Sequence, residues 1–527
     1  MTPSPPSARK LGKKMGSKTH EYIVMLPFLA QGHLIPFLAL ARQIHQRTGF
    51  TITIANTPLN IKYLRSTILS HDHDHDLHSN SSSDSNFIHL AELPFCSTQH
   101  GLRPNTENTE NLSLKDIATL CHASMTLEAP FHSLVRDITD KEGKPPLCII
   151  SDVFFGWAVN VANSIGCASI NFTTCGAYGT SAYISFWLNL PHRFSESDEF
   201  ALPGFPDRCQ FRASQLHPFA RAADGTDTWS TYMQPLISYS LLSHGWLCNT
   251  VEEFEPLGLE ILRKFIKLPV WTIGPLLPSA ASKKCSDSNI FRQRTGKKHG
   301  ISPEKCIELL NLHRPGTVLY ISFGSQNTIS ASHVMELALG LEASGKPFIW
   351  VLRPPLGFDI KGEFREEWLP EGFEKRMNES KQGLLVQNWA PQLEILSHES
   401  IGAFLSHCGW NSVLESLSQG LPIIGWPMAA EQIYNSKMLV EEMGVCVELT
   451  WGVQREIERK EVKRVIDLVM NKNEGQGKEM KKKAAEIGKR IRAATKDQEE
   501  GSSVKALDEF VRTILAKTTL EHHNHKI

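Results

Sequence analysis

Residues that could bind a phosphorylated ligand are concentrated in one segment of the chain, 389–432. Its strand-like run IGAFLS leads into a tight His-Cys-Gly turn at 407–409, and a helix is expected to begin near Trp410 and end at Gly420. A helix N-terminus directly after a strand offers free backbone N–H groups and the positive end of a dipole to a phosphate. The segment therefore predicts an anion site at this turn.

Side chains of the same segment suit the other parts of a nucleotide. His407, Asn411 and Ser412 add hydrogen-bonding groups at the phosphate position. Glu415 follows Asn411 by one helical turn, where a carboxylate can accept bonds from two ribose hydroxyls. Trp389 offers a planar surface for a base. Each residue alone could equally be a buried core side chain or a helix cap, so the prediction depends on their combination.

A general base is expected at His33. A hydroxyl nucleophile must lose its proton, and histidine is the side chain best suited to accept it near neutral pH. His33 follows the strand-like run 21–28, in the crevice where α/β folds bind ligands. Asp152 ends a second such run, 147–152, and could orient the imidazole if the two strands are neighbours. By position alone, a structural histidine and a helix-capping aspartate explain these residues about equally well.

Other nucleotide and metal motifs fit the sequence less well. The run GLEASGKP at 340–347 resembles a phosphate-binding loop, but Pro347 has no hydroxyl and the local order is helix, loop, strand. No G-x-G-x-x-G follows a strand, which argues against a dinucleotide oxidoreductase or epimerase. Cys408 lies beside His407 without a second Cys/His pair at ligand spacing, so no metal is expected.

The elements that must position these residues form two α/β units. Runs 21–28 and 51–55 are strand-like, and the helix between them is expected to have Pro36 in its first turn. Strand, helix, strand at this spacing implies a parallel sheet with a right-handed crossover. The pattern recurs at 147–172 and, after the middle of the chain, from 316 to 427. We expect two doubly wound domains with a cleft between them.

The composition is typical of a soluble protein with more than one domain. The chain has 527 residues, of which 41% are hydrophobic and 21% charged, and a formal net charge of −1. This balance gives no electrostatic reason to expect a nucleic-acid partner. No apolar segment is long enough to span a membrane. Eleven cysteines without close pairing indicate reduced thiols and a cytoplasmic location.

Three biased segments are not expected to carry the function. The tract HDHDHDLH at 71–78 has a metal-binding composition but is expected to be a mobile, solvated loop. The basic run 478–496 has an apolar stripe and predicts an amphipathic surface helix rather than a membrane or nucleic-acid site. Residues 1–19 are expected to form a disordered leader, with a targeting role left open.

The segment 389–432 resembles, nearly end to end, the signature box of plant UDP-dependent glycosyltransferases that act on small metabolites. Further runs similar to landmarks of this family are PFLAQGHLIP, LCNTVEEFE, VLYISFGS and GSSVKALDEFV. The resemblance implies an α/β protein of GT-B fold, in which two Rossmann-like domains with parallel sheets face each other across a cleft. It also implies inverting transfer from a UDP-sugar co-substrate, without metal or other cofactor.

The resemblance predicts the domain organisation and the role of each site residue. The expected units are an acceptor domain at 20–270, a linker at 271–302, a UDP-sugar domain at 303–500, and a C-terminal helix and polar tail at 501–527. The implied catalytic pair is His33 and Asp152. The implied UDP-sugar ligands are Trp389, Ala390 and Gln392 at uracil, Glu415 at ribose, His407, Asn411, Ser412 and Ser325 at the diphosphate, and Trp410, Glu431, Gln432 and Thr174 at the sugar.

The expected activity is transfer of glucose to a hydroxyl of a small lipophilic plant metabolite by a monomeric enzyme, giving a β-glucoside. Trp410 and Gln432 accompany UDP-glucose in this family, although Glu431 stands where aspartate is more common. Another UDP-sugar and a catalytically silent UDP-sugar-binding relative remain alternatives, and the acceptor could be a flavonoid or other phenolic, or a terpenoid. The candidate acceptor walls, which could equally be ordinary core, are Tyr178, Tyr183, Phe186, Trp187, Phe194, Phe200, Phe205, Phe211, Phe219 and Trp229.

Overall fold

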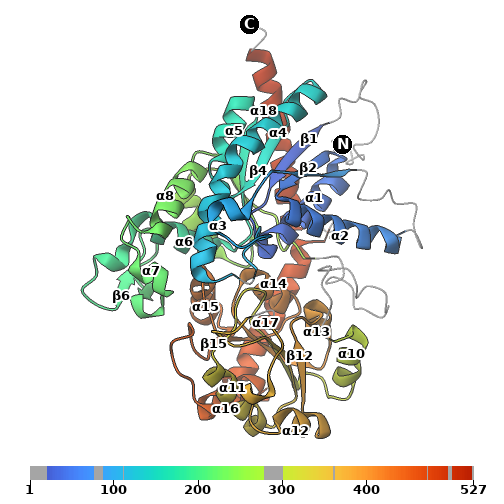
Figure 1. Ribbon diagram of the computed structural model, residues 1–527, viewed down its shortest axis with the longest axis vertical. Helices are drawn as coiled ribbons and strands as arrows, with labels where there is room; N and C mark the ends of the chain where they lie inside the picture. The colour runs from blue at the N-terminus through green and yellow to red at the C-terminus, as the bar shows by residue number, and fades with distance from the viewer. Residues whose placement is uncertain are drawn as a thin grey trace, which may run out of the picture.

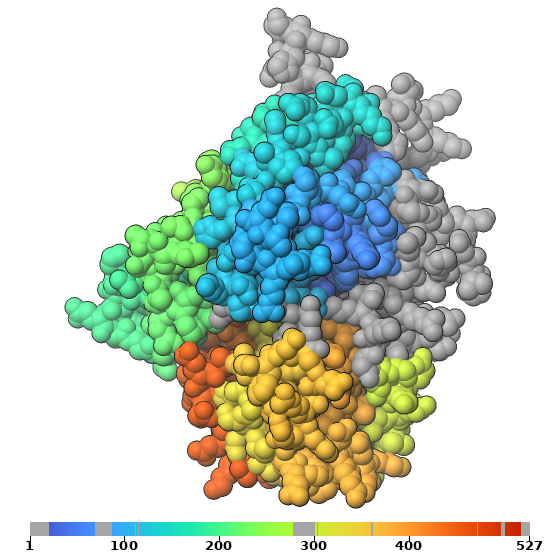
Figure 2. Space-filling view, in the orientation of Figure 1, coloured from blue at the N-terminus to red at the C-terminus, as the bar shows by residue number. Residues whose placement is uncertain are grey.

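The computed structural model describes residues 21–75, 87–110, 112–277, 301–359, 362–471, 473–496 and 501–524. They form two domains, each built on a parallel sheet, with the N-terminal domain above the C-terminal domain in Figure 1. The space-filling view in Figure 2 shows the same division between the blue-to-green half and the yellow-to-red half. The expected α/β architecture of two Rossmann-like domains is confirmed. The leader at 1–19 and most of the expected linker lie outside the described residues.

The sheet of the N-terminal domain has seven strands in the order β3-β2-β1-β4-β5-β8-β9. Its apolar strands are almost entirely buried because helices cover both faces, as parallel sheets require. The strand order reverses at the hydrogen-bonded neighbours β1 and β4, which is where α/β folds bind ligands. The strands are β1 Tyr22–Leu26, β2 Thr51–Asn56, β3 Ile88–Glu92, β4 Cys148–Asp152, β5 Ala168–Thr173, β8 Gly245–Cys248 and β9 Val270–Thr272.

The sheet of the C-terminal domain repeats this design with six strands in the order β12-β11-β10-β13-β14-β15. Here the order reverses between β10 and β13, which are also hydrogen-bonded neighbours. The two reversal points are therefore the places where ligand-binding residues are expected in each domain. The strands are β10 Val318–Ser322, β11 Phe348–Leu352, β12 Gly383–Gln387, β13 Ile401–Ser406, β14 Ile423–Gly425 and β15 Cys446–Glu448.

The helices of the N-terminal domain are α1 Gln31–Thr48, α2 Pro58–His75, α3 Leu114–Ser124, α4 Glu128–Glu142, α5 Ala158–Ile165, α6 Ala177–Asn189, α7 Pro218–Ala222, α8 Thr228–Ser240 and α9 Pro256–Ile266. A short antiparallel pair, β6 Glu199–Ala201 and β7 Gln210–Arg212, lies between α6 and α7. The later helices are α10 Pro303–Asn311, α11 Ala331–Ser344, α12 Phe373–Glu379, α13 Gln392–Ser397, α14 Trp410–Ser418, α15 Gln432–Glu441, α16 Arg459–Met470, α17 Gly475–Ala494 and α18 Ser502–Asn524. No helix among the described residues is long and apolar enough to cross a membrane.

The C-terminal helix α18 packs on the N-terminal domain, as the red helix in the upper half of Figure 1 shows. Leu507, Phe510 and Ile514 are buried in the core that contains the central strands of the first sheet. The Phe510 ring lies 5.3 Å from that of Trp271 on β9, and Asp508 forms an ion pair with Arg47 of α1. The chain therefore crosses between the domains twice, which ties them together.

Several element boundaries differ from the expectation. Helix α1 begins at Gln31, so Pro36 lies inside the helix rather than in its first turn, and His33 is helical rather than in a loop. The expected His/Asp-rich loop is helical at its beginning, because α2 continues to His75, and the rest of it lies outside the described residues. Strand β9 ends at Thr272, two residues beyond the expected edge of the acceptor domain. The amphipathic helix expected at 478–496 is confirmed as α17.

Candidate active site

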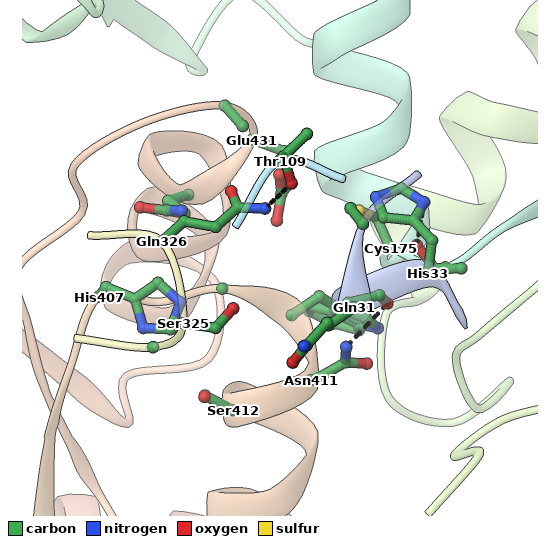
Figure 3. A pocket seen from close by; sticks show the side chains of 18 of the residues that line it. Gln31, His33, Thr109, Cys175, Ser325, Gln326, His407, Asn411, Ser412 and Glu431 are labelled. Atoms are coloured by element: carbon green, nitrogen blue, oxygen red, sulfur yellow. Dashed lines mark hydrogen bonds between the residues drawn. The ribbon is translucent and has the colours of Figure 1, made fainter. Parts of the chain in front are cut away.

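A cavity of about 370 Å³ lies between the two domains, at the reversal points of both sheets. Figure 3 shows His33 on one side of it and Ser325, His407 and Ser412 on the other. All of the residues expected to bind a UDP-sugar line this cavity, as does His33. Asp152 is buried behind His33.

The expected catalytic pair is brought together by the central strands of the first sheet. Asp152 ends β4, and His33 follows the neighbouring strand β1 in the first turn of α1. The Asp152 Oδ2 atom lies 2.6 Å from His33 Nδ1, and Oδ1 accepts a bond of 3.1 Å from the backbone N–H of Phe154. The carboxylate thus has a fixed orientation and holds the Nδ1 side of the imidazole, leaving Nε2 for a ligand.

Electrostatics favour a basic imidazole at His33. Burial opposes the charged form, but the Asp152 carboxylate, its hydrogen bond and the charge of Glu431 outweigh burial and raise the pKa of His33 above its ordinary value. The hydroxyl of Thr174, expected near the sugar, lies 3.3 Å from His33 Nδ1. His33 can therefore take a proton from a hydroxyl group and remain stabilised as an imidazolium.

The residues expected to bind an anion follow strands of the second sheet. Ser325 follows β10, and His407 follows β13. Helix α14 begins at Trp410, and its N-cap is Gly409. Because glycine has no side chain to cap the helix, the first backbone N–H groups of α14 remain available to a ligand. Cys408 has a left-handed backbone, with φ of 61°, which makes the turn tight. Burial and, to a smaller extent, Arg353 lower the pKa of His407 to about 4, so its imidazole is neutral and donates a single N–H.

A connected hydrogen-bond network joins residues expected to bind the ribose, the base and the diphosphate. Gln392 Nε2 donates to Glu415 Oε2 at 2.7 Å and to Ser412 Oγ at 3.1 Å, and its Oε1 accepts from the Tyr320 hydroxyl at 3.3 Å. The network holds the Glu415 carboxylate at the cavity wall, where it can accept from hydroxyls. Trp389, directly after β12, and Ala390 line the cavity beside it.

Three of the residues expected at the sugar make different contacts in the cavity. Gln432 Oε1 accepts 3.0 Å bonds from the backbone N–H groups of Met428 and Ala429, which fixes its amide and leaves Nε2 as a donor. Burial raises the pKa of Glu431. The Trp410 indole donates to the backbone carbonyl of Asn249 at 2.7 Å, so its N–H anchors the domain interface and is not available to a sugar.

A proline inside α1 makes a backbone carbonyl available for a further contact between the domains. Pro36 has no N–H, so the carbonyl of Gly32, four residues earlier, lacks the usual helical bond from residue 36. Asn411 at the start of α14 donates to this carbonyl at 3.0 Å. The helical turn that carries His33 is thereby tied to the helix that faces the anion site.

The N-terminal domain supplies an apolar wall. The Phe28 and Phe154 rings pack 4.9 Å apart beside His33, and the Phe219 and Trp229 rings stack at 4.5 Å. Of the aromatic residues expected as walls, Tyr183, Phe219 and Trp229 line the cavity, whereas Phe194 is 84% exposed. The others pack into the core instead: Tyr178, Phe186, Trp187, Phe200, Phe205 and Phe211.

Sequence reasoning missed several cavity residues. Phe28 and Phe154 could have been found, because each follows a central strand at the same edge as His33 and Asp152. Gln326 has no sequence signal, and the structure shows its amide donating to the Thr109 hydroxyl of the other domain. Arg353 also lines the cavity and follows β11.

Family models match both domains of the chain. The model described as "Glycosyltransferase, N-terminal domain" matches residues 21–278, and the model described as "UDP-glucoronosyl and UDP-glucosyl transferase" matches residues 303–483. The two matches together span the described sheets and the cavity residues of both domains.

Relatives and solved structures match over nearly the whole chain. UDP-glycosyltransferase 92A1 of Arabidopsis thaliana is 41% identical over 502 residues, which cover 94% of this chain and 97% of the relative. Crocetin glucosyltransferase 3 of Crocus sativus is 42% identical over 473 residues, covering 87% and 92%. The crystal structure of Glycyrrhiza uralensis UGT73P12, in complex with glycyrrhetinic acid 3-O-monoglucuronide, aligns with a TM-score of 0.79 at 27% identity, covering 96% and 98%.

Proposed function

This chain belongs to the plant UDP-dependent glycosyltransferases, and we propose that it transfers glucose from UDP-glucose to a hydroxyl group of a small, lipophilic acceptor. The observation that carries the proposal is the His33–Asp152 pair, whose 2.6 Å contact lies in the same cavity as the predicted UDP ligands. A basic imidazole accelerates attack by a hydroxyl nucleophile, whereas binding of the sugar nucleotide alone does not call for one, so the pair argues against a silent relative.

The proposed reaction is a single displacement at the anomeric carbon. His33 Nε2 accepts the proton of the acceptor hydroxyl while its oxygen forms a bond to C1 of the sugar, and the bond between C1 and the UDP oxygen breaks. Asp152 stabilises the imidazolium. Backbone N–H groups at the start of α14, with His407 and Ser325, stabilise the negative charge that develops on UDP. Attack opposite the leaving group converts an α-linked donor into a β-glucoside.

Gln432 supports glucose as the transferred sugar. Because its oxygen is held by two backbone N–H groups, the side chain presents an N–H donor to the hydroxyls of a hexose. Glu431 provides an acceptor beside it, and its longer side chain replaces the more common aspartate. A donor and an acceptor side by side match the paired hydroxyls of a neutral hexose.

The apolar wall supports an uncharged, lipophilic acceptor. Among the described cavity residues, the acceptor half is lined mainly by aromatic and aliphatic side chains and carries no lysine or arginine, so an anionic acceptor would find neither of these cations there. Flavonoids and other phenolics, and terpenoid alcohols, have the required combination of an apolar body and a hydroxyl. The ten cysteines in the described part of the chain are not joined in disulfides, which supports a cytoplasmic location.

Turnover with defined donors tests the proposal. The purified protein is incubated with a panel of phenolic and terpenoid alcohols and with UDP-glucose, UDP-galactose or UDP-glucuronate, and products are identified by mass. We expect a hexose-sized mass gain with UDP-glucose and little product with the other donors. Preferential turnover of UDP-galactose or UDP-glucuronate contradicts the donor assignment, and UDP binding without any product contradicts the assignment of a transferase.

A further inference from the structure

We propose that Arg353 binds the diphosphate of the donor directly, and that Glu110 of the facing domain competes with the diphosphate for its guanidinium. This inference concerns the donor site and rests on the proposed function. Neither residue belongs to the signature segment 389–432.

The position of Arg353 follows from the order of strands in the second sheet. Arg353 comes directly after β11, which is hydrogen-bonded to β10 on one side and β12 on the other. Ser325 follows β10, and Trp389 follows β12, at the same edge of the sheet. Arg353 therefore lies between the residue expected at the diphosphate and the residue expected at uracil, and it lines the cavity.

Arg353 forms no ion pair with the described residues. It is the one lysine or arginine among the described residues that line the cavity, and no carboxylate lies within ion-pair distance of it in the described part of the chain. Its Nε makes a long 3.4 Å bond to the backbone carbonyl of Asn388, and its buried Nη1 has no hydrogen-bond partner. The Nη1 group thus has a hydrogen-bonding capacity that the described residues do not use, in a side chain that lines the cavity. A guanidinium suits a diphosphate, whose oxygens can accept two parallel bonds.

The pKa shifts around Arg353 place it near the expected diphosphate ligands. Burial lowers the pKa of Arg353, and the charge of Glu110 opposes that effect. Arg353 in turn is the charge that helps to lower the pKa of His407. The guanidinium is thus within electrostatic reach both of His407 and of a carboxylate from the facing domain.

Glu110 is held in place by another contact. Gln31 Nε2 donates to Glu110 Oε2 at 2.9 Å, and the adjacent Thr109 accepts from Gln326 of the C-terminal domain. The segment that carries Glu110 therefore contacts both domains, within electrostatic reach of Arg353. A diphosphate entering the cavity would share the guanidinium with this carboxylate, whose negative charge also repels the ligand.

The test measures the affinities of uridine, UMP and UDP by titration calorimetry for the wild-type protein, Arg353→Gln, Arg353→Lys and Glu110→Gln. We expect Arg353→Gln to weaken UDP binding by about 10- to 100-fold, the range for hydrogen bonds to charged groups, while uridine binding changes less than about twofold. Arg353→Lys should retain part of the affinity for UDP. Glu110→Gln should strengthen UDP binding a few-fold, because the competing charge is removed.

The control is Arg365→Gln, which removes an exposed arginine of the same domain that pairs with Glu367. Equal losses for uridine and UDP in Arg353→Gln would overturn the proposal, since they would show that Arg353 merely supports Asn388 and the base site. Unchanged UDP affinity in that variant would also overturn it. Failure of the proposed function is distinguishable, because the wild-type protein would then form no product or would not bind UDP at all.

Discussion

The two walls of the cavity differ in chemistry and in how the chain supplies them. The donor wall is polar and comes mainly from one contiguous segment, 389–432, in which a strand, a turn and a helix deliver their groups to one place. The acceptor wall is apolar and is assembled from segments spread between Phe28 and Leu277. A polar ligand requires particular atoms at particular positions, whereas an apolar ligand requires only a space of suitable shape.

This difference explains why the donor can be inferred more closely than the acceptor. Replacing a donor-wall residue removes a specific bond, and the effect should appear in UDP affinity. Replacing an acceptor-wall residue removes contact area that neighbouring side chains can partly restore. The proposed catalytic pair lies where the two walls meet, and so does the hydrogen bond from the Asn411 side chain to the Gly32 carbonyl. Changes at this junction should therefore affect turnover rather than the affinity for either substrate alone.

The largest effect is expected for His33→Ala, which removes the proposed base at the junction of the walls. We expect kcat to fall by about 10²- to 10⁴-fold, the usual contribution of general base catalysis. The affinity for UDP, measured by calorimetry, should stay near the wild-type value because the donor wall is intact. Wild-type turnover in this variant would show that the base has been assigned wrongly.

Asp152→Asn tests the coupling between the paired residues. An asparagine amide can donate to His33 Nδ1, which puts the imidazole proton on Nε2 and blocks proton acceptance, so kcat should fall strongly. In the wild-type protein the pKa of His33 is raised, so His33 becomes protonated at a pH above the ordinary histidine value of about 6.5. We therefore expect kcat/KM to begin to decline above that pH as the solution is made more acidic.

Removing the carboxylate removes the main charge that raises the pKa of His33, so the acid limb of the kcat/KM profile of Asp152→Asn should move to lower pH. The measurement is kcat/KM against pH at saturating UDP-glucose for both proteins. An acid limb at the same pH in both would mean that another group controls it.

Trp389→Ala isolates the donor wall. Base stacking on an aromatic side chain contributes about 1–3 kcal/mol, so UDP affinity should fall roughly 10- to 100-fold. Turnover at saturating UDP-glucose should change little, because Trp389 is remote from His33 in the proposed arrangement. The measurements are UDP titration and kcat, and unchanged UDP affinity would contradict the stacking assignment.

Trp229→Ala is the matching change in the acceptor wall. Trp229 is half-buried and stacks on Phe219, so its loss should raise the acceptor KM by about 2- to 10-fold, corresponding to roughly 0.5–1.5 kcal/mol for one aromatic contact. The KM for UDP-glucose should not change. A shift in the donor KM instead would show that the two walls are not separable.

The smallest effect is expected for Pro36→Ala, which tests how the walls are aligned. Alanine restores the N–H that can bond to the Gly32 carbonyl within α1 and thus competes with Asn411. We expect kcat to fall about 2- to 5-fold, a change no larger than the net free energy of one hydrogen bond allows. The affinity for UDP should not change. In a background of Asn411→Ala, the same substitution should have no further effect on kcat, and additive losses would contradict the shared contact.

Much of the fold was predictable because each strand and helix carries its own periodicity. The strands that lead to His33, Ser325 and His407, and the strand that ends at Asp152, were expected close to their observed bounds. The parallel sheets followed from the alternation of strands and helices. The predicted start of α1 was wrong because proline is most common in the first turn of a helix, whereas Pro36 lies further inside α1. The Gly32 carbonyl, which Pro36 cannot bond, accepts a hydrogen bond from Asn411 of the other domain instead.

The sequence by itself determined the two α/β domains, the anion-binding turn and the chemical types of the donor-site residues, since these depend on residues that are neighbours along the chain. The tertiary structure decided which strands pair, and so brought Asp152 within 2.6 Å of His33 from 119 positions away. It also decided which aromatic residues face the cavity, and it placed Arg353 and Glu110 on opposite sides of the cleft. Such contacts form between segments that are far apart in the sequence, whereas periodicity depends on residues that are close in the sequence and so cannot predict them.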